Sequence, residues 1–340
     1  MKNNENHLAF NLWRNIKSIL PGLMACVFVA LSATFIAQHY NAPAMLLCLL
    51  FGISLNFMSN KKSTQQGIDF TAITLLRAGI VLIGARIMMS DFIALGGEMV
   101  ALVFFTTISV VILGLVFAKA LGLDREQGFL IGGATAICGA SAALAISAIL
   151  PRTKTLEQNT LLSIIGVTLM GTFAMIMYPA LIGYFNFNDQ QAGILIGGAI
   201  HDVSQVVGAG YSISEDAGDM AMLVKLMRVF LLVPLLLIFV FGIGKKKEED
   251  QATHFPFPIF LIGFVVMMLL NSFHFIPEDI ASILKDTSKW FLIMAISAVG
   301  IKTSPKALLD LGWKSIFLIC GETIFIFVIY LTFILMQSNA

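Results

Sequence analysis

The chain has 340 residues, of which 58% are hydrophobic and 12% are charged, and its mean hydropathy is +0.90. Because a soluble domain carries about 25% charged residues, this composition excludes an ordinary soluble enzyme or binding domain and favours a membrane protein. The net charge is +1 and the chain has no basic tail, so nothing indicates a nucleic-acid partner.

Apolar runs of roughly 20 residues recur along the chain and predict an all-α polytopic membrane protein with about eleven transmembrane helices. We expect one integral membrane domain over 1–340, beginning with an anchor helix that is not a cleaved signal peptide. The expected spans are 18–38, 42–58, 69–89, 99–121, 127–150, 158–184, 190–210, 219–242, 257–273, 286–304 and 313–336.

The loops differ in charge. Lys61, Lys62 and the polar loop Gly244–His254, which holds three lysines, fall on one side of the expected membrane, and the acidic loops around Glu215 and Glu278 fall on the other. Positive loops stay cytoplasmic. The N-terminus is therefore expected in the cytoplasm and the C-terminus outside.

No pattern points to a cofactor or to catalysis. The cysteines lie in apolar segments without CxxC spacing, which predicts neither a disulfide framework nor a zinc site. The chain has no phosphate-binding P-loop, no HExxH and no Gly-x-Ser-x-Gly motif. We expect no cofactor, no metal and no enzymatic activity.

The expected span 127–150 has a centre of small residues, Gly132–Ser141. Glycine makes a helix break inexpensive, and a break in a membrane frees peptide groups that need a partner. We therefore expect a discontinuous helix that lines a substrate site, with Thr135, Cys138, Gly139 and Ser141 nearest the ligand. The alternative is a continuous helix whose small residues pack against a neighbour.

A short internal similarity aligns Ile73–Arg77 with Val224–Arg228. It predicts an inverted repeat of five plus five helices: 1–40 is an extra helix, 41–186 the first repeat and 187–338 the second. Span 286–304 then becomes the second discontinuous, crossing helix, with its break at Gly300. Two competing similarities pair Gly128–Ala134 with Gly193–Ala199, two spans apart, and Gly84–Gly96 with Gly300–Gly312, seven spans apart. Neither divides the chain into halves, so both are interpreted as chance matches between Gly-rich helices.

Arg77 and Arg228 are the sharpest polar signals. Each lies about eight residues into its span, roughly 12 Å deep, where an arginine is a functional candidate by default. A guanidinium offers paired donors to an oxyanion. Alternatively, the arginines snorkel or cap carbonyls freed at a neighbouring break.

The segment Gly197–Gly210 contains His201, Asp202 and Gln205. On a continuous helix His201 and Gln205 share one face, and His201 and Asp202 are candidates for carrying a coupling proton or ion. The alternative is a polar network that links helices. Glu322 is a weaker candidate that can neutralise a buried cation. The charges within spans lean positive, which favours an anionic ligand.

Four segments resemble the YeiH-type family of bacterial inner-membrane proteins, whose members carry a sulfate-exporter label. They are Leu76–Arg86, Gly132–Ala142, Gly198–Gly210 and Lys225–Val229. The family usually has Glu after the His, so Asp202 keeps the charge on a shorter side chain.

The resemblance implies the cation:proton antiporter and anion transporter group, with an inverted repeat, two crossing discontinuous helices and elevator movement. It implies a multi-pass protein of the bacterial inner membrane that exports a sulfate-, sulfite- or sulfonate-like anion. Such scaffolds commonly dimerise, so a homodimer is compatible with it. Two other readings stay open: an exchanger coupled to protons or sodium through Asp202, and a membrane receptor that transports nothing.

Overall fold

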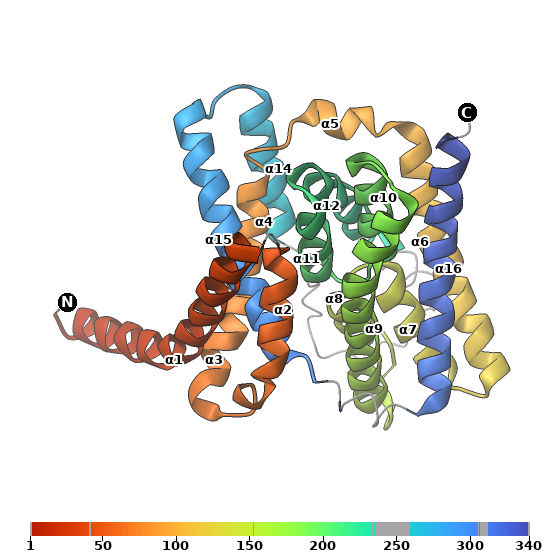
Figure 1. The fold of residues 1–340 in the computed structure, drawn as a ribbon. Helices are drawn as coiled ribbons and strands as arrows, with labels where there is room; N and C mark the ends of the chain where they lie inside the picture. The colour runs from red at the N-terminus through yellow and green to blue at the C-terminus, as the bar shows by residue number, and fades with distance from the viewer. Residues whose placement is uncertain are drawn as a thin grey trace. The chain divides into compact units, whose positions relative to one another are not determined.

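The computed structural model describes residues 2–40, 42–151, 153–232, 234–235, 259–304, 306 and 312–338, and every regular element among them is helical (Figure 1). The expected loop Gly244–His254 lies outside the described residues. In the described part, five helical stretches are long and apolar enough to cross a membrane: Lys17–Tyr40, Lys62–Ile83, Gly96–Leu121, Leu156–Phe185 and Trp313–Gln337.

The chain divides into two compact units. The first comprises Met1–Met89 and Phe260–Ser304, and the second comprises Ser90–Ile259 and Pro305–Ala340. Each unit thus combines an early part of the chain with a late part.

The first unit is built on α1 and α15. Its helices are α1 (Lys2–Tyr40), α2 (Ala44–Ser54), η1 (Asn56–Met58), α3 (Lys62–Phe70), the π-helical turn η2 (Thr71–Leu75), α4 (Leu76–Ile83), α14 (Ile259–Ser272) and α15 (Glu278–Lys302). Phe28 and Phe35 on α1 are each 72% exposed. Large exposed apolar side chains on a long helix are suited to contact with lipid.

The expected break at Gly300 is wrong, because α15 continues as one helix to Lys302. A Cβ atom at Gly300 would lie 2.5 Å from the Leu49 carbonyl oxygen and 2.9 Å from Gly52 Cα. The glycine is therefore needed where α15 crosses α2 closely. The small residues that suggested a break serve packing in this helix.

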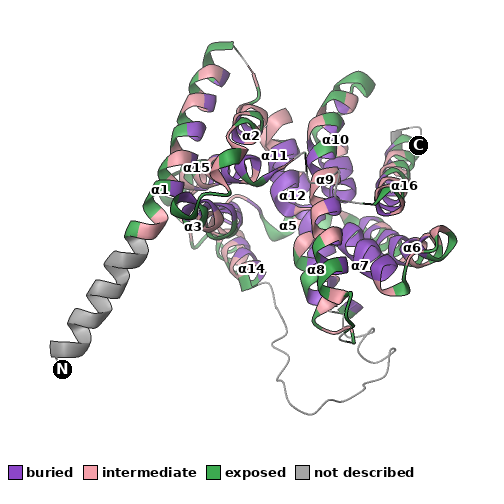
Figure 2. Ribbon diagram, turned by 90° about the horizontal axis from the view of Figure 1, so that it is seen from below, coloured by how far each residue is buried: buried purple, intermediate pink, exposed green. Residues whose placement is uncertain are grey.

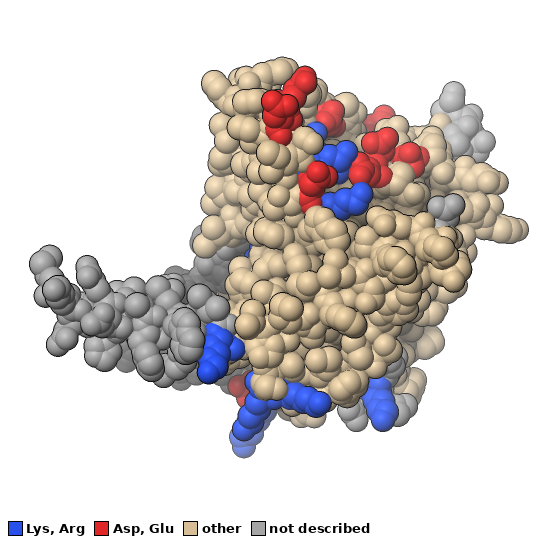
Figure 3. Space-filling view, turned by 60° about the vertical axis from the view of Figure 1, so that its left-hand side comes forward, with Lys and Arg blue, Asp and Glu red and all other residues tan. Residues whose placement is uncertain are grey.

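The second unit contains the broken helices. Its elements are α5 (Met89–Ala94), α6 (Gly96–Leu121), α7 (Arg125–Ala136), α8 (Ala140–Ser147), α9 (Leu156–Phe185), α10 (Asp189–Ala199), α11 (Val203–Ile213), α12 (Glu215–Phe230) and α16 (Trp313–Ser338). Figure 2 shows that α7 and α12 are buried along most of their length. Figure 3 shows one face of the molecule, on which most Asp and Glu side chains lie in the upper part together with some Lys and Arg, while other Lys and Arg side chains lie along the bottom.

Candidate functional site: two helical hairpins meeting at their tips

The expected span 127–150 is a helical hairpin. Helix α7 ends at Ala136, the chain turns through Ile137–Gly139, and α8 runs back. The return is fixed at the base, where the Glu126 carboxylate accepts hydrogen bonds from Thr153 Oγ1 at 2.6 Å and Asn159 Nδ2 at 2.8 Å. Thr153 and Asn159 follow α8, so both arms begin and end at the same end of α9. The break predicted from small residues is confirmed.

A second hairpin is formed by α10 and α11. Its turn is Ile200–Asp202, and its base is closed by Ser214 Oγ, which donates to Asp189 Oδ1 at 2.7 Å. An Asn188–Gln191 capping box starts α10. The expected single span 190–210 is thus two short helices, because the chain turns back at His201.

The two hairpins start from opposite ends of α9 (Figure 1). The first has its base at the α9 N-terminus. The second has its base at the α9 C-terminus, because only three residues separate Phe185, the last residue of α9, from the first residue of α10. Their tips nonetheless meet: a Cβ atom on Gly139 would lie 3.2 Å from Asp202 Oδ2. One crossing helix therefore separates two equivalent hairpins of opposite direction.

This arrangement corrects the reading of the internal similarity. The matching segments Gly128–Ala134 and Gly193–Ala199 both lie in the first arm of their hairpin, in α7 and in α10. The interpretation as a chance match took each hairpin for a complete crossing. Since each hairpin turns back, one long helix, α9, lies between the two segments.

Arg228 on α12 holds the ends of both first arms. Its Nε donates to the Ala136 carbonyl at 2.9 Å and its Nη2 to the Thr135 carbonyl at 3.0 Å, and Nη1 donates to the Gly198 carbonyl. The side chain is completely buried. Carbonyls at a helix C-terminus lack helical partners and carry partial negative charge, so one guanidinium satisfies α7 and α10 together.

Lys225, one turn earlier on α12, completes the second tip. Its Nζ donates to the Ile200 carbonyl at 2.7 Å and also to the His201 carbonyl, and the side chain is completely buried. Sequence reasoning placed Lys225 within a span but gave it no role. Lys225 and Arg228 are three residues apart, which puts both on one face of α12. This spacing is the sequence feature from which a joint role of the two cations can be predicted.

The second arms present their N-termini at the tips, and these two ends differ. At α11, Asp202 Oδ1 accepts from the Ser204 amide at 2.9 Å and from Ser204 Oγ at 2.6 Å. At α8, the N-cap position is Gly139, with φ 63° and ψ −126°, and no side chain caps the helix. Ser141 in this first turn is exposed. Of the two N-termini at the tips, that of α8 is therefore the one without a side-chain cap.

His201 and Gln205 do not share a helix face, because α11 begins only at Val203. His201 is completely buried in the turn, and its Nε2 is 2.9 Å from Thr323 Oγ1 on α16. Gln205 points instead to α9, where its Nε2 donates to the Thr168 carbonyl at 2.8 Å. Cys138, only 4% exposed, lies in the first tip.

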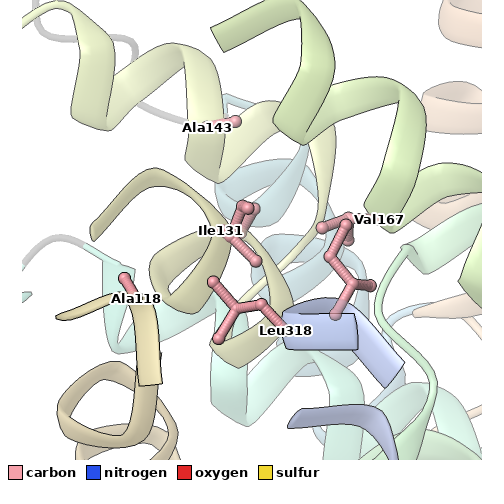
Figure 4. Packing of buried hydrophobic residues seen from close by; sticks show 7 residues of the cluster. Ala118, Ile131, Ala143, Val167 and Leu318 are labelled. Atoms are coloured by element: carbon pink, nitrogen blue, oxygen red, sulfur yellow. The ribbon is translucent and has the colours of Figure 1, made fainter. Parts of the chain in front are cut away.

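The first hairpin is packed on three sides. Ala118 on α6, Ile131 on α7, Ala143 on α8, Val167 on α9 and Leu318 on α16 form one buried cluster (Figure 4). Both arms thus have apolar contacts with long helices, which fixes the depth at which the tip lies.

Arg77 and Gly300 belong to the first unit and are not part of this cluster of tip residues. The Arg77 side chain is exposed, and its guanidinium lies 5.8 Å from the centre of the Phe260 ring. Arg77 and Arg228, which the predicted repeat pairs with each other, therefore lie in different surroundings: Arg77 is exposed and Arg228 is buried. No group of three or more His, Cys, Asp or Glu side chains suited to a metal occurs among the described residues.

Comparisons with known proteins place the chain in a family. Residues 21–319 match the family model described as Conserved hypothetical protein 698. The chain is 41% identical over 321 residues to the UPF0324 membrane protein CT0845 of Chlorobaculum tepidum, covering 94% of this chain and 90% of that one. It is 42% identical over 315 residues to the UPF0324 membrane protein TauZ of Paracoccus denitrificans, covering 92% and 93%.

The chain belongs to the UPF0324 membrane protein family. This confirms the YeiH-type resemblance of the sequence and makes the chain a membrane protein. No solved structure matches it.

Proposed function

We propose that the protein is a secondary transporter of a small anion of the sulfate or sulfite type, with its site at the two hairpin tips. The observation that carries the proposal is the meeting of four half-helix ends within one unit. Two of them are C-termini already satisfied by Arg228 and Lys225, and two are N-termini, of which that of α8 has no side-chain cap.

The charges at the tips favour an anion. Each helix end carries roughly half an elementary charge, so two C-termini and two N-termini cancel to about zero. The two positive side chains, Arg228 and Lys225, together with the one carboxylate, Asp202, give the tips one net formal positive charge. This sum leaves out Glu322. Backbone N–H groups at a helix N-terminus are a ready anion site, and Ser141 adds a hydroxyl donor beside them.

Hairpins that meet from opposite directions suit alternating access, because each tip separates the site from one side of the membrane. All the tip residues belong to the second unit. We assign the carrier role to this unit and the scaffold role to the first. The resemblance supplies the sulfate-like class and the location in the bacterial inner membrane.

The alternative exchanger relied on Asp202 as the coupling group. Asp202 Oδ1 already accepts two hydrogen bonds from Ser204, which is the ordinary work of an N-cap carboxylate. This engagement favours a positioning role for Asp202 over the cycling of an ion.

The test is exchange of labelled sulfate or sulfite across liposomes that contain the purified protein. We expect saturable exchange above the level of protein-free liposomes. Binding of sulfate to the detergent-solubilised protein without exchange would identify a receptor. Absence of both binding and exchange for sulfate, sulfite and a small alkylsulfonate would overturn the proposal.

A further inference from the structure

Glu322 is a carboxyl group inside the second unit that the anion site does not use. It lies roughly 13 Å along α16 from Trp313, and its side chain is completely buried. Two glycines make room for it: a Cβ atom on Gly114 of α6 would lie 2.5 Å from its Oε1, and one on Gly132 of α7 would lie 3.4 Å away.

Neither carboxyl oxygen of Glu322 has a hydrogen-bond partner among the described residues. The Thr135 hydroxyl, which is the neighbouring polar group, is also buried and has no hydrogen-bond partner among the described residues. An unpaired buried carboxylate costs several kcal/mol relative to water. A proton bound to either oxygen removes that charge.

Within the part of the chain that the structure describes, no Lys or Arg side chain forms an ion pair with Glu322. The helices packed against α16 are α6, α7, α9 and α10, and the Lys and Arg side chains of α6 and α7 lie at their ends. The titratable side chains of these helices, the tips, α12 and α16 are Glu98, Lys119, Arg125, Glu126, Cys138, Glu157, Tyr178, Tyr184, Asp189, His201, Asp202, Glu215, Asp216, Asp219, Lys225, Arg228, Lys314, Cys320 and Tyr330. Arg228 and Lys225 direct their donors to backbone carbonyls instead.

Glu322 is nevertheless connected to both tips. Thr135, its polar neighbour, is the last residue but one of α7, and the Thr135 carbonyl accepts from Arg228 at 3.0 Å. The next residue on α16, Thr323, is 2.9 Å from the ring of His201 in the second tip. A change of charge at Glu322 therefore occurs next to the residues through which α16 contacts both hairpins.

We propose that Glu322 binds and releases the proton that accompanies the anion during transport. This inference rests on the proposed function and names its coupling ion. With Glu322 ionised, its charge and that of Asp202 balance Arg228 and Lys225. With the proton bound, one formal positive charge remains for the anion. Each ligand thus strengthens the binding of the other, and both move in the same direction.

A proton fits this site better than a metal ion. Calcium and magnesium take six or more oxygen ligands, several of them usually carboxylates. Among the described residues, Glu322 belongs to no group of three or more His, Cys, Asp or Glu side chains suited to a metal. The chemical step is only the formation of an Oε–H bond on loading and its cleavage on release.

The experiment separates anion movement from its coupling. Liposomes containing the wild-type protein or Glu322→Gln are clamped at zero membrane potential, and labelled sulfate is followed first in exchange and then under a pH gradient. For one proton per anion, one pH unit sustains about tenfold accumulation on the alkaline side. We expect this from the wild type, and exchange without accumulation from Glu322→Gln.

Glu98→Gln is the matched control, because Glu98 lies exposed in the first turn of α6 and we expect it to behave as wild type. Accumulation by Glu322→Gln equal to that of the wild type would overturn the inference while leaving the proposed function intact. If the wild type exchanges no sulfate or sulfite, the proposed function fails instead. Infrared titration then still decides whether a buried carboxyl signal disappears in Glu322→Gln, and its persistence would overturn proton binding at Glu322.

A variant that unfolds is recognised by its melting temperature and by size-exclusion chromatography. Gly114→Ala provides a second route, because it leaves the carboxyl in place while its Cβ would lie 2.5 Å from Oε1. We expect reduced coupling in this variant as well. Because the same Cβ would also lie 2.8 Å from the Gly128 carbonyl oxygen, its melting temperature is compared with that of the wild type. Full coupling in Gly114→Ala would count against a proton on the crowded Oε1.

Discussion

The two hairpins share one construction and differ at their tips. In both, the first arm carries the similar sequence Gly128–Ala134 or Gly193–Ala199, and its C-terminal carbonyls are held by buried cations of α12. In the second hairpin, Asp202 caps the returning helix. In the first, Gly139 takes that position and provides no side chain. The second tip is thus capped by a side chain of the protein and the first is not, and the proposed anion would take the place of that cap.

The largest expected effect comes from the contact that the hairpins share. Arg228→Met leaves carbonyls of α7 and α10 without their donor, and each unpaired buried group costs about 1–3 kcal/mol. We expect loss of sulfate exchange and a lower melting temperature in stabilising detergent. Arg228→Lys keeps the charge but not the fork of donors, so it should restore folding more than transport.

Arg77→Met is the matched control for Arg228→Met. The Arg77 side chain is exposed and contacts the Phe260 ring, so its removal should lower the melting temperature far less. Equal losses of stability in the two variants would mean that the hydrogen bonds from Arg228 to the carbonyls do not stabilise the fold more than the exposed Arg77 side chain does.

The next effect is specific to the first tip. Gly139 has φ 63° and ψ −126°, a conformation that side chains resist at a cost of about 1–3 kcal/mol. Its Cβ would also approach Asp202 Oδ2. We expect Gly139→Ala to weaken sulfate binding, measured by calorimetry, on the order of tenfold to a hundredfold.

Gly183→Ala controls for the added methyl group, because a Cβ there meets nothing within 4 Å. If Gly139→Ala bound sulfate as strongly as the wild type, the proposal that sulfate binds at the first tip would be wrong.

The sequence predicts only part of this difference between the two tips, namely that the helix breaks within 127–150. The break at Cys138–Gly139 followed from its small residues, because glycine makes interruption of a helix inexpensive. The same argument failed at Gly300, where small residues allow α15 to cross α2. Local composition indicates that a backbone approaches something closely, but the approaching group belongs to a distant part of the chain.

The direction of the chain after each break was also beyond the sequence. A helix that breaks and continues and a helix that turns back have the same apolar composition. The contacts that decide between them join residues far apart, such as Glu126 with Asn159. Arg228 was identified by its depth, yet its partners are backbone atoms, which carry no sequence signal.

A smaller effect is expected from the cap of the second tip. Asn is as good an N-cap as Asp, so Asp202→Asn should retain the melting temperature to within a few degrees. The loss of one negative charge should strengthen sulfate binding several-fold at low salt, and added salt should reduce the gain.

Asp202→Asn also distinguishes the two carboxyl groups. If pH-driven accumulation disappears in Asp202→Asn and persists in Glu322→Gln, Asp202 is the coupling group and the second tip is more than a structural cap.

The smallest effect compares single hydroxyl groups in the first turns of α8 and α11. Ser141 is exposed beside the uncapped N-terminus of α8, whereas Ser204 Oγ already donates to Asp202 at 2.6 Å. A hydrogen bond to a ligand contributes about 0.5–1.5 kcal/mol, so Ser141→Ala should weaken sulfate binding by roughly threefold to tenfold. Ser204→Ala should leave sulfate affinity unchanged and lower the melting temperature. The opposite pattern would place the ligand at the second tip, because the hydroxyl that responds to sulfate marks the helix end that the ligand completes.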